Sequence, residues 1–200
     1  MRTLDPVKHA EKRGEILLAA WRCMARSGFR GTSTADVCKE AGISPGHLYH
    51  YFDSKEAIVT ALTERGLQKA EKYFSDTMQK PNALAAMVSD LDRHKTGKND
   101  DYRAFSLLVL EMLVEAARNP TVAKIVRANT RKIKSLLVDF LKTGQNRGQI
   151  DPNLNAVAAA TVMLTVMDGM KITAIRDPKA DTAKYIAYLQ ILISRFLSPP

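Results

Sequence analysis

Apolar residues recur at helical spacing along most of the chain. Over residues 9–27, one side of a helix would carry Ile16, Leu17, Ala20, Cys23 and Met24, at the three- and four-residue intervals of an amphipathic helix. Glycine and proline stand between segments of this kind, and no alternating pattern typical of strands persists. The pattern therefore predicts an all-α chain.

Two short helices are expected next, over residues 33–41 and 44–51. Ser33 and Asp36 have the spacing of a capping box at the start of the first helix, and Gly42 follows its end. Ser44 caps the second helix, whose first turn holds Pro45, where a missing N–H costs nothing. Two helices joined by such a turn have the spacing of a helix-turn-helix, in which the second helix enters the major groove of DNA.

The rest of the chain is expected to form longer helices. The first runs from residue 53 towards 74 or 78, and Pro81 then marks a break. Further helices are predicted over 82–95, 102–118, 121–147, 154–175 and 181–197. The segment 154–175 is apolar nearly all round, so it must be buried on several sides, and a partner chain could supply the cover. We therefore expect a three-helix domain with the helix-turn-helix over 1–53 and a second helical domain over 54–200, to which the family resemblance described below assigns ligand binding and dimerisation.

Charge and composition restrict the class of protein. The net charge of +9 favours a polyanionic partner, although residues 1–55 hold nine Lys/Arg against six Asp/Glu. The stronger block, 117–147, holds eight Lys/Arg against one acidic residue and is interpreted as a solvated helix face. The N-terminus lacks the apolar core of a signal peptide, no long charge-free apolar run is present, and Cys23 and Cys38 form no disulfide framework. These features predict a cytoplasmic protein.

Residues 10–60 resemble the DNA-binding head of TetR-type transcriptional regulators. The resemblance is carried by Phe29, Thr32, Ser33, Thr34, Val37, Ala41, Gly42, Ile43, Ser44, Gly46, Leu48, Tyr49, His50, Tyr51, Phe52, Ser54, Lys55 and Glu56. Residues 130–175, with the segments 148–151 and 167–170, are similar to the C-terminal domain of a betaine-regulator-like branch. The resemblance implies a homodimer whose two heads bind a palindromic double-stranded DNA operator and whose C-terminal domain binds a small-molecule inducer.

The DNA-binding residues expected from these patterns lie in the two short helices and just after them. Hydroxyls, helix starts and one lysine are suited to phosphate, and His47 is placed to reach base edges. Proline has no donor, so Pro45 can make only apolar contact with a base. Leu48 and Phe52 are interpreted as core. The full expected set is Ser33, Thr34, Ser44, Pro45, Gly46, His47, Tyr49, His50, Tyr51 and Lys55.

Two further sets of residues are expected in the C-terminal domain. Taken singly, each methionine there is best interpreted as core, but as a group they could line an adaptable pocket. The expected pocket residues are Met87, Leu91, Phe105, Leu108, Met112, Ile133, Leu137, Met163 and Met167. The expected dimer interface is formed by Leu164, Met167, Ile186, Leu189, Ile193 and Phe196. Glu111 and Glu115 are interpreted as surface charge, the latter beside Arg118, although an inward carboxylate would favour a cationic ligand.

Catalytic and metal-binding functions are not expected. His47 and His50 are spaced three apart near Asp53, but no second ligand cluster accompanies them, so neither metal nor cofactor is predicted. No nucleophile, base and orienting group are recognisable, so the chain is not expected to be an enzyme. The sequence predicts a ligand-responsive repressor. The alternative is an all-helical small-molecule binding protein or enzyme with a vestigial head, which would lack sequence-specific DNA binding.

Overall fold

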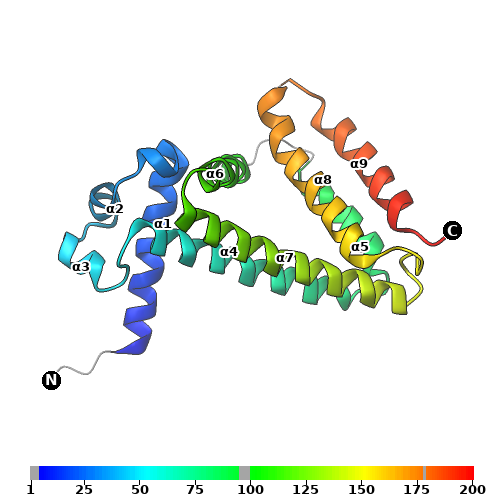
Figure 1. Ribbon diagram of the computed structural model, residues 1–200, viewed down its shortest axis with the longest axis horizontal. Helices are drawn as coiled ribbons and strands as arrows, with labels where there is room; N and C mark the ends of the chain where they lie inside the picture. Colours follow the sequence, from blue (N-terminus) through cyan, green and yellow to red (C-terminus); the bar gives the residue numbers. More distant parts are fainter. Residues whose placement is uncertain (1–4, 95–99, 178) are drawn as a thin grey trace. The chain divides into compact units, whose positions relative to one another are not determined.

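The computed structural model describes residues 5–94, 100–177 and 179–200, and every regular element in these ranges is helical. The predicted all-α class is confirmed. The chain forms two compact units, each treated separately below. The first comprises Met1–Gly66 and Ala104–Arg127, and the second comprises Leu67–Arg103 and Ala128–Pro200. Figure 1 shows the elements of both.

The first three helices begin and end at the capping residues that the sequence contains. Helix α1 (Pro6–Gly31) starts before the predicted position, because the Asp5 carboxylate accepts the Val7 N–H at 3.0 Å. Helix α2 (Thr34–Ala41) starts at the predicted capping box and ends at Gly42, whose φ of 63° and ψ of 38° are left-handed. Helix α3 (Pro45–Tyr49) is a single short turn capped by Ser44, and it is shorter than the predicted 44–51.

The core of the first unit takes side chains from beyond the three N-terminal helices. Helices α4 (Lys55–Met78), α6 (Asp100–Ala116) and α7 (Pro120–Asn146) each have residues in both units. Ile58 of α4, Met112 of α6 and Val122 of α7 are buried in the same core cluster as the inward residues of α1. The functional division into 1–53 and 54–200 therefore remains a prediction, since the compact unit around α1–α3 also includes residues 104–127.

The second unit contains α5 (Ala83–Ser89), α8 (Ala156–Arg176) and α9 (Thr182–Leu197), with α8 and α9 antiparallel (Figure 1). The single helix predicted over 82–95 is wrong in its second half: the chain tightens into a 3-10 helix, η1, at Asp90–His94, and residue 95 lies outside the described ranges. Gln149 closes the break before α5, because its side chain accepts the Ala83 N–H at 3.0 Å and donates to the Pro81 carbonyl at 2.8 Å.

Part of the predicted dimer interface belongs instead to this chain's own core. Ile186, Leu189 and Ile193 are at most 9% exposed, so they are not available to a partner. Leu164 and Phe196 are half-buried against the same core, and Met167 is exposed. The exposed apolar residues of these two helices are Val157, Val162, Met167 and Ile175 on α8, and Tyr188, Ile191 and Leu192 on α9. Helix α9 has two apolar stripes, and periodicity does not say which one faces the core of its own chain.

The predicted pocket residues occupy core and surface positions. Leu108 and Met112 pack in the core of the first unit, whereas Met87, Leu91, Leu137 and Met163 pack in that of the second. Ile133 is half-buried, and Phe105 and Met167 are exposed. A cavity of about 240 Å³ in the second unit has a different lining, namely Glu71, Phe74, Ser75, Met78, Leu136, Asp139, Phe140 and Thr143.

Helix α8 is apolar enough over Ala156–Thr173 to cross a membrane by length and composition alone. Core helices of soluble proteins pass the same test, so one such helix is weak evidence. The hydroxyls of Thr161 and Thr165 donate to carbonyls one turn earlier on the same helix, at 2.9 and 3.0 Å. These O–H donors are therefore satisfied within α8. The exposed side of α8 thus includes Val157, Val162 and Met167 beside threonines whose hydroxyls are already bonded.

Candidate DNA-binding site

A left-handed glycine and two buried side chains hold α3 on the first unit. The N–H of Ile43 donates to the Cys38 carbonyl at 3.0 Å, which closes the turn that Gly42 makes possible. The Ser44 hydroxyl accepts the His47 N–H at 3.2 Å. Leu48 and Phe52 are buried in the core, as predicted, and they fix which side of α3 faces inward.

The remaining side of α3 is exposed. Pro45, Gly46, His47 and His50 are all exposed, and Tyr49 is 54% exposed although it is a large aromatic side chain. These are the positions that the sequence assigns to DNA. The structure thus leaves the residues expected to contact DNA exposed to solvent at the second helix of the helix-turn-helix, as a groove-reading helix requires.

Tyr51 differs from its neighbours because it is half-buried. Its ring stacks on His9 of α1 at a centroid distance of 4.6 Å and lies 5.6 Å from the His47 ring. One flat face of the ring is therefore occupied within the protein and is not available to DNA. His9 was not among the residues that the sequence singled out, since its proximity to Tyr51 has no local signal.

The polar groups of Ser33 and Asp36 at the start of α2 hydrogen-bond to each other. The Ser33 hydroxyl donates to the Asp36 carboxylate at 2.6 Å and accepts the Asp36 N–H at 3.1 Å. These bonds, with the Ser33 N–H as second donor, hold the pKa of Asp36 below its ordinary value. Phosphate binding by Ser33 would require its hydroxyl to leave Asp36, whereas Thr34 has no such competitor among the bonds described. Both assignments remain predictions.

Lys55 has partners that the sequence did not predict. Its Nζ donates to the carbonyls of Phe29 at 2.9 Å and Thr32 at 3.1 Å, and it lies 4.2 Å from the centre of the Phe29 ring. A lysine has three N–H donors, so one is left for a phosphate. Lys55 is therefore a structural residue of the first unit as well as a predicted phosphate ligand.

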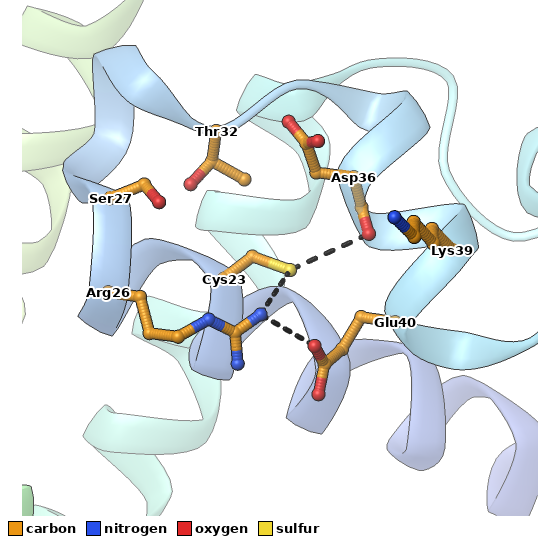
Figure 2. A pocket seen from close by; sticks show the side chains of 7 residues that line it. All are labelled: Cys23, Arg26, Ser27, Thr32, Asp36, Lys39 and Glu40. Atoms are coloured by element: carbon orange, nitrogen blue, oxygen red, sulfur yellow. Dashed lines mark hydrogen bonds and ion pairs between the residues drawn. The ribbon is translucent and has the colours of Figure 1, made fainter.

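A polar cavity of about 450 Å³ lies between α1 and α2 (Figure 2). The Cys23 thiol, which lines it, donates to the Asp36 carbonyl at 3.6 Å, and Arg26 donates to the Cys23 sulfur at 3.6 Å and to Glu40 at 2.6 Å. Burial raises the pKa of Cys23, and the Arg26 charge opposes this only in part. The group is thus a neutral thiol beside a structural ion pair, without the thiolate that a reactive cysteine needs.

Glu111 and Glu115 of α6 contact the end of α1. Glu111 Oε2 accepts the Phe29 N–H at 2.7 Å, and Glu115 pairs with Arg30 at 2.6 Å. The sequence suggested Arg118 as the neighbour of Glu115. Arg118 does lower the pKa of Glu115, but the hydrogen bond from Arg30 is the larger cause.

Comparisons with known proteins agree with this geometry. The sequence profile described as "Bacterial regulatory proteins, tetR family" matches residues 16–62, and "BetI-type transcriptional repressor, C-terminal" matches residues 97–198. The chain is 27% identical over 188 residues to the HTH-type transcriptional regulator UidR of Escherichia coli (strain K12), covering 93% of each.

Solved structures show the same fold. A putative TetR-family regulator from Rhodococcus sp. superposes with a TM-score of 0.81 at 23% identity, covering 94% of this chain and 100% of the other. A putative regulator from Saccharomonospora viridis, crystallised with choline, has a TM-score of 0.76 at 20% identity, covering 96% and 100%.

The head and its exposed turn define a helix-turn-helix transcriptional regulator. More particularly, the chain belongs to the TetR family of bacterial regulatory proteins, with a C-terminal domain of the BetI type.

Proposed function

We propose that this protein is a homodimeric repressor that binds a palindromic operator through α3 and leaves it when a small-molecule inducer binds the second unit. The observation that supports DNA reading most strongly is the exposed surface of Pro45, Gly46, His47, Tyr49 and His50, carried on a turn whose inner residues are fully buried. A regulator with this function works in the cytoplasm and needs no catalytic centre.

The homodimer is supported by the exposed apolar stripes of α8 and α9. Tyr188 is 64% exposed, and Leu192 is 53% exposed one turn further on. Neighbouring exposed apolar side chains mark interaction surfaces in soluble proteins, and two-fold dimers use the same surface on both subunits. A second copy of this chain is the occupant that a two-fold palindrome requires.

A single substitution tests the dimer. Leu192→Glu places a charge in the proposed interface without touching the core, so we expect a folded monomer by light scattering at micromolar concentration. Lys184→Glu is the control, since it adds a carboxylate at another exposed position of α9. A Leu192→Glu protein that stays dimeric would place the interface elsewhere.

The proposed inducer is a small molecule. The related fold from Saccharomonospora viridis was crystallised with choline, and choline serves here as one probe in a thermal-shift screen of metabolites. A ligand at a hundred times its Kd stabilises the folded state by about 2.7 kcal/mol. We expect at least one such compound to lower operator affinity as well.

Footprinting tests operator binding. The full-length protein is titrated against DNA from upstream of its own gene, at moderate salt and with competitor DNA, because affinities depend strongly on salt. We expect protection of a site with two inverted halves. An all-helical binding protein or enzyme with a vestigial head would protect no sequence above the competitor background.

A further inference from the structure

The segment between α1 and α2, residues 28–32, has an unusual backbone. Gly28 interrupts the helical path with φ 71° and ψ 175°, a conformation that is essentially restricted to glycine. The chain then makes one more turn, and the Thr32 hydroxyl donates back to the Gly28 carbonyl at 2.8 Å. We call this segment the α1–α2 joint. It immediately precedes Ser33, the cap of α2, so its conformation sets where the helix-turn-helix begins.

Side chains from two other helices bind the backbone of one residue in this joint. The Phe29 N–H donates to the Glu111 carboxylate of α6 at 2.7 Å. The Phe29 carbonyl accepts from the Lys55 ammonium of α4 at 2.9 Å, and Lys55 also donates to the Thr32 carbonyl at 3.1 Å. A carboxylate on the N–H and an ammonium on the C=O of a single residue are both charge-assisted hydrogen bonds, roughly twice as strong as neutral ones.

The surroundings of the joint leave it little freedom. The Phe29 side chain is 3% exposed, with Lys55 over its ring. A Cβ atom on Gly28 would lie 2.5 Å from Glu111 Oε2, so the Glu111 carboxylate packs directly against the joint, in space that a side chain at position 28 would need. Arg30 of the joint also forms an ion pair with Glu115 of α6. Figure 1 shows α6 beside this end of α1.

We propose that Glu111 and Lys55 are positioning residues for operator recognition: they fix the α1–α2 joint and thereby the placement of α2 and α3 relative to α1. Glu111 lies on the helix that packs behind the joint, and its hydrogen bond is made to the protein's own backbone. This inference rests on the proposed operator binding, because it concerns how the reading surface is held.

Removing the Glu111 carboxylate should change DNA affinity in the direction opposite to that expected from charge alone. DNA is a polyanion, so removing a carboxylate from a DNA-binding protein strengthens binding, or leaves it unchanged, when the carboxylate has no other role. Glu111 must have the opposite effect if it positions the joint. Loss of the carboxylate leaves the Phe29 N–H without a partner, and the unpaired N–H destabilises the conformation of the joint that binds the operator.

The test uses the full-length protein with two duplexes, the footprinted operator fragment and a scrambled sequence of the same length. Glu111→Ala removes the acceptor, Glu111→Gln keeps an oxygen that can accept from Phe29, and Glu64→Ala on the exposed surface of α4 is the charge-matched control. We expect Glu111→Ala to weaken operator binding about tenfold while affinity for the scrambled duplex is unchanged or higher. Glu111→Gln should recover most of the operator affinity, and Glu64→Ala should bind both duplexes at least as well as the wild type.

Lys55→Met provides a second, independent variant. We expect it to lose operator affinity by a larger factor than affinity for the scrambled duplex, whereas a residue that only binds phosphate weakens both equally. Amide hydrogen exchange of the wild type should show a protected Phe29 N–H, a readout that requires no variant to fold.

Operator binding by Glu111→Ala equal to that of the wild type would overturn the proposal, as would an equal loss on both duplexes or a fast-exchanging Phe29 amide. A wild type that does not distinguish the two duplexes would instead refute the proposed operator binding itself.

Discussion

Substitution of Gly28 by alanine is expected to destabilise the first unit through two separable effects. The first is backbone strain, since a non-glycine residue at φ 71° and ψ 175° costs about 1–3 kcal/mol. The second is a steric clash, because the new Cβ would lie 2.5 Å from Glu111 Oε2. A flexible carboxylate can rotate away from this contact, but it then loses the 2.7 Å bond to the Phe29 N–H, at a cost of about 1–3 kcal/mol.

Gly42→Ala is the matched control, because Gly42 also has a positive φ, of 63°, but nothing lies within 4 Å of its Cβ position. Strain of about 1–2 kcal/mol is the main cost there. The free energy of unfolding is measured in urea by the fluorescence of Trp21, the chain's one tryptophan, which lies on α1. We expect Gly28→Ala to cost about 1–3 kcal/mol more than Gly42→Ala, the value of the lost hydrogen bond.

A double-mutant cycle assigns that difference to its cause. In a Glu111→Ala background no carboxylate is displaced, so Gly28→Ala should cost only the backbone strain, and the two substitutions should couple by about 1–3 kcal/mol. Equal costs at Gly28 and Gly42, together with no coupling to Glu111, would show that the Glu111 carboxylate does not contact the α1–α2 joint as described.

Three further predictions concern specificity, pH and packing. His47→Ala should change the preferred base at one position in each half-site, measured by sequencing selected DNA; equal weakening on all sequences would contradict that role. The pKa values of Asp36 and Glu115 are lowered by hydrogen bonds from Ser33 and Arg30, respectively. Their contribution to the free energy of unfolding is therefore complete above their ordinary pKa values, about 3.9 and 4.3, and is lost as the pH falls through the lowered ones. Trp21 fluorescence in urea should show this acid loss, and a gain in stability on acidification would disprove it. Gly144→Ala should destabilise the second unit by about 1–3 kcal/mol despite better helix propensity, because its Cβ would lie 2.5 Å from Ile150 Cδ1; thermal unfolding should show partial recovery with Ile150→Val, and a more stable Gly144→Ala protein would count against the packing.

Features encoded within a few residues could be predicted from the sequence. The capping box at Ser33 and the left-handed turn at Gly42 are local devices, and both are present in the structure. The inward side of α3 was predictable for the same reason, since Leu48 is the one aliphatic side chain of the short helix and Phe52 follows it by one turn.

Features that depend on distant residues were not predictable. The bond between Phe29 and Glu111 joins positions 82 residues apart, and that between Lys55 and Phe29 joins positions 26 apart. A glutamate beside an apolar helix face is ordinary surface charge in most proteins, so nothing local marks Glu111 as a backbone ligand. The burial of Ile186 and the exposure of Tyr188 on α9 likewise have no local signal, because both stripes of the helix are apolar and only tertiary packing distinguishes them.

The central claim is that the exposed surface of α3 reads a specific DNA sequence. The most direct test is selection of bound duplexes from a random DNA library by the full-length protein, with competitor DNA present, followed by sequencing. The account predicts enrichment of one motif made of two inverted half-sites, and loss of that enrichment when His47 and Tyr49 are both replaced by alanine. A library that remains random after selection, or a motif unchanged by the double substitution, would contradict it.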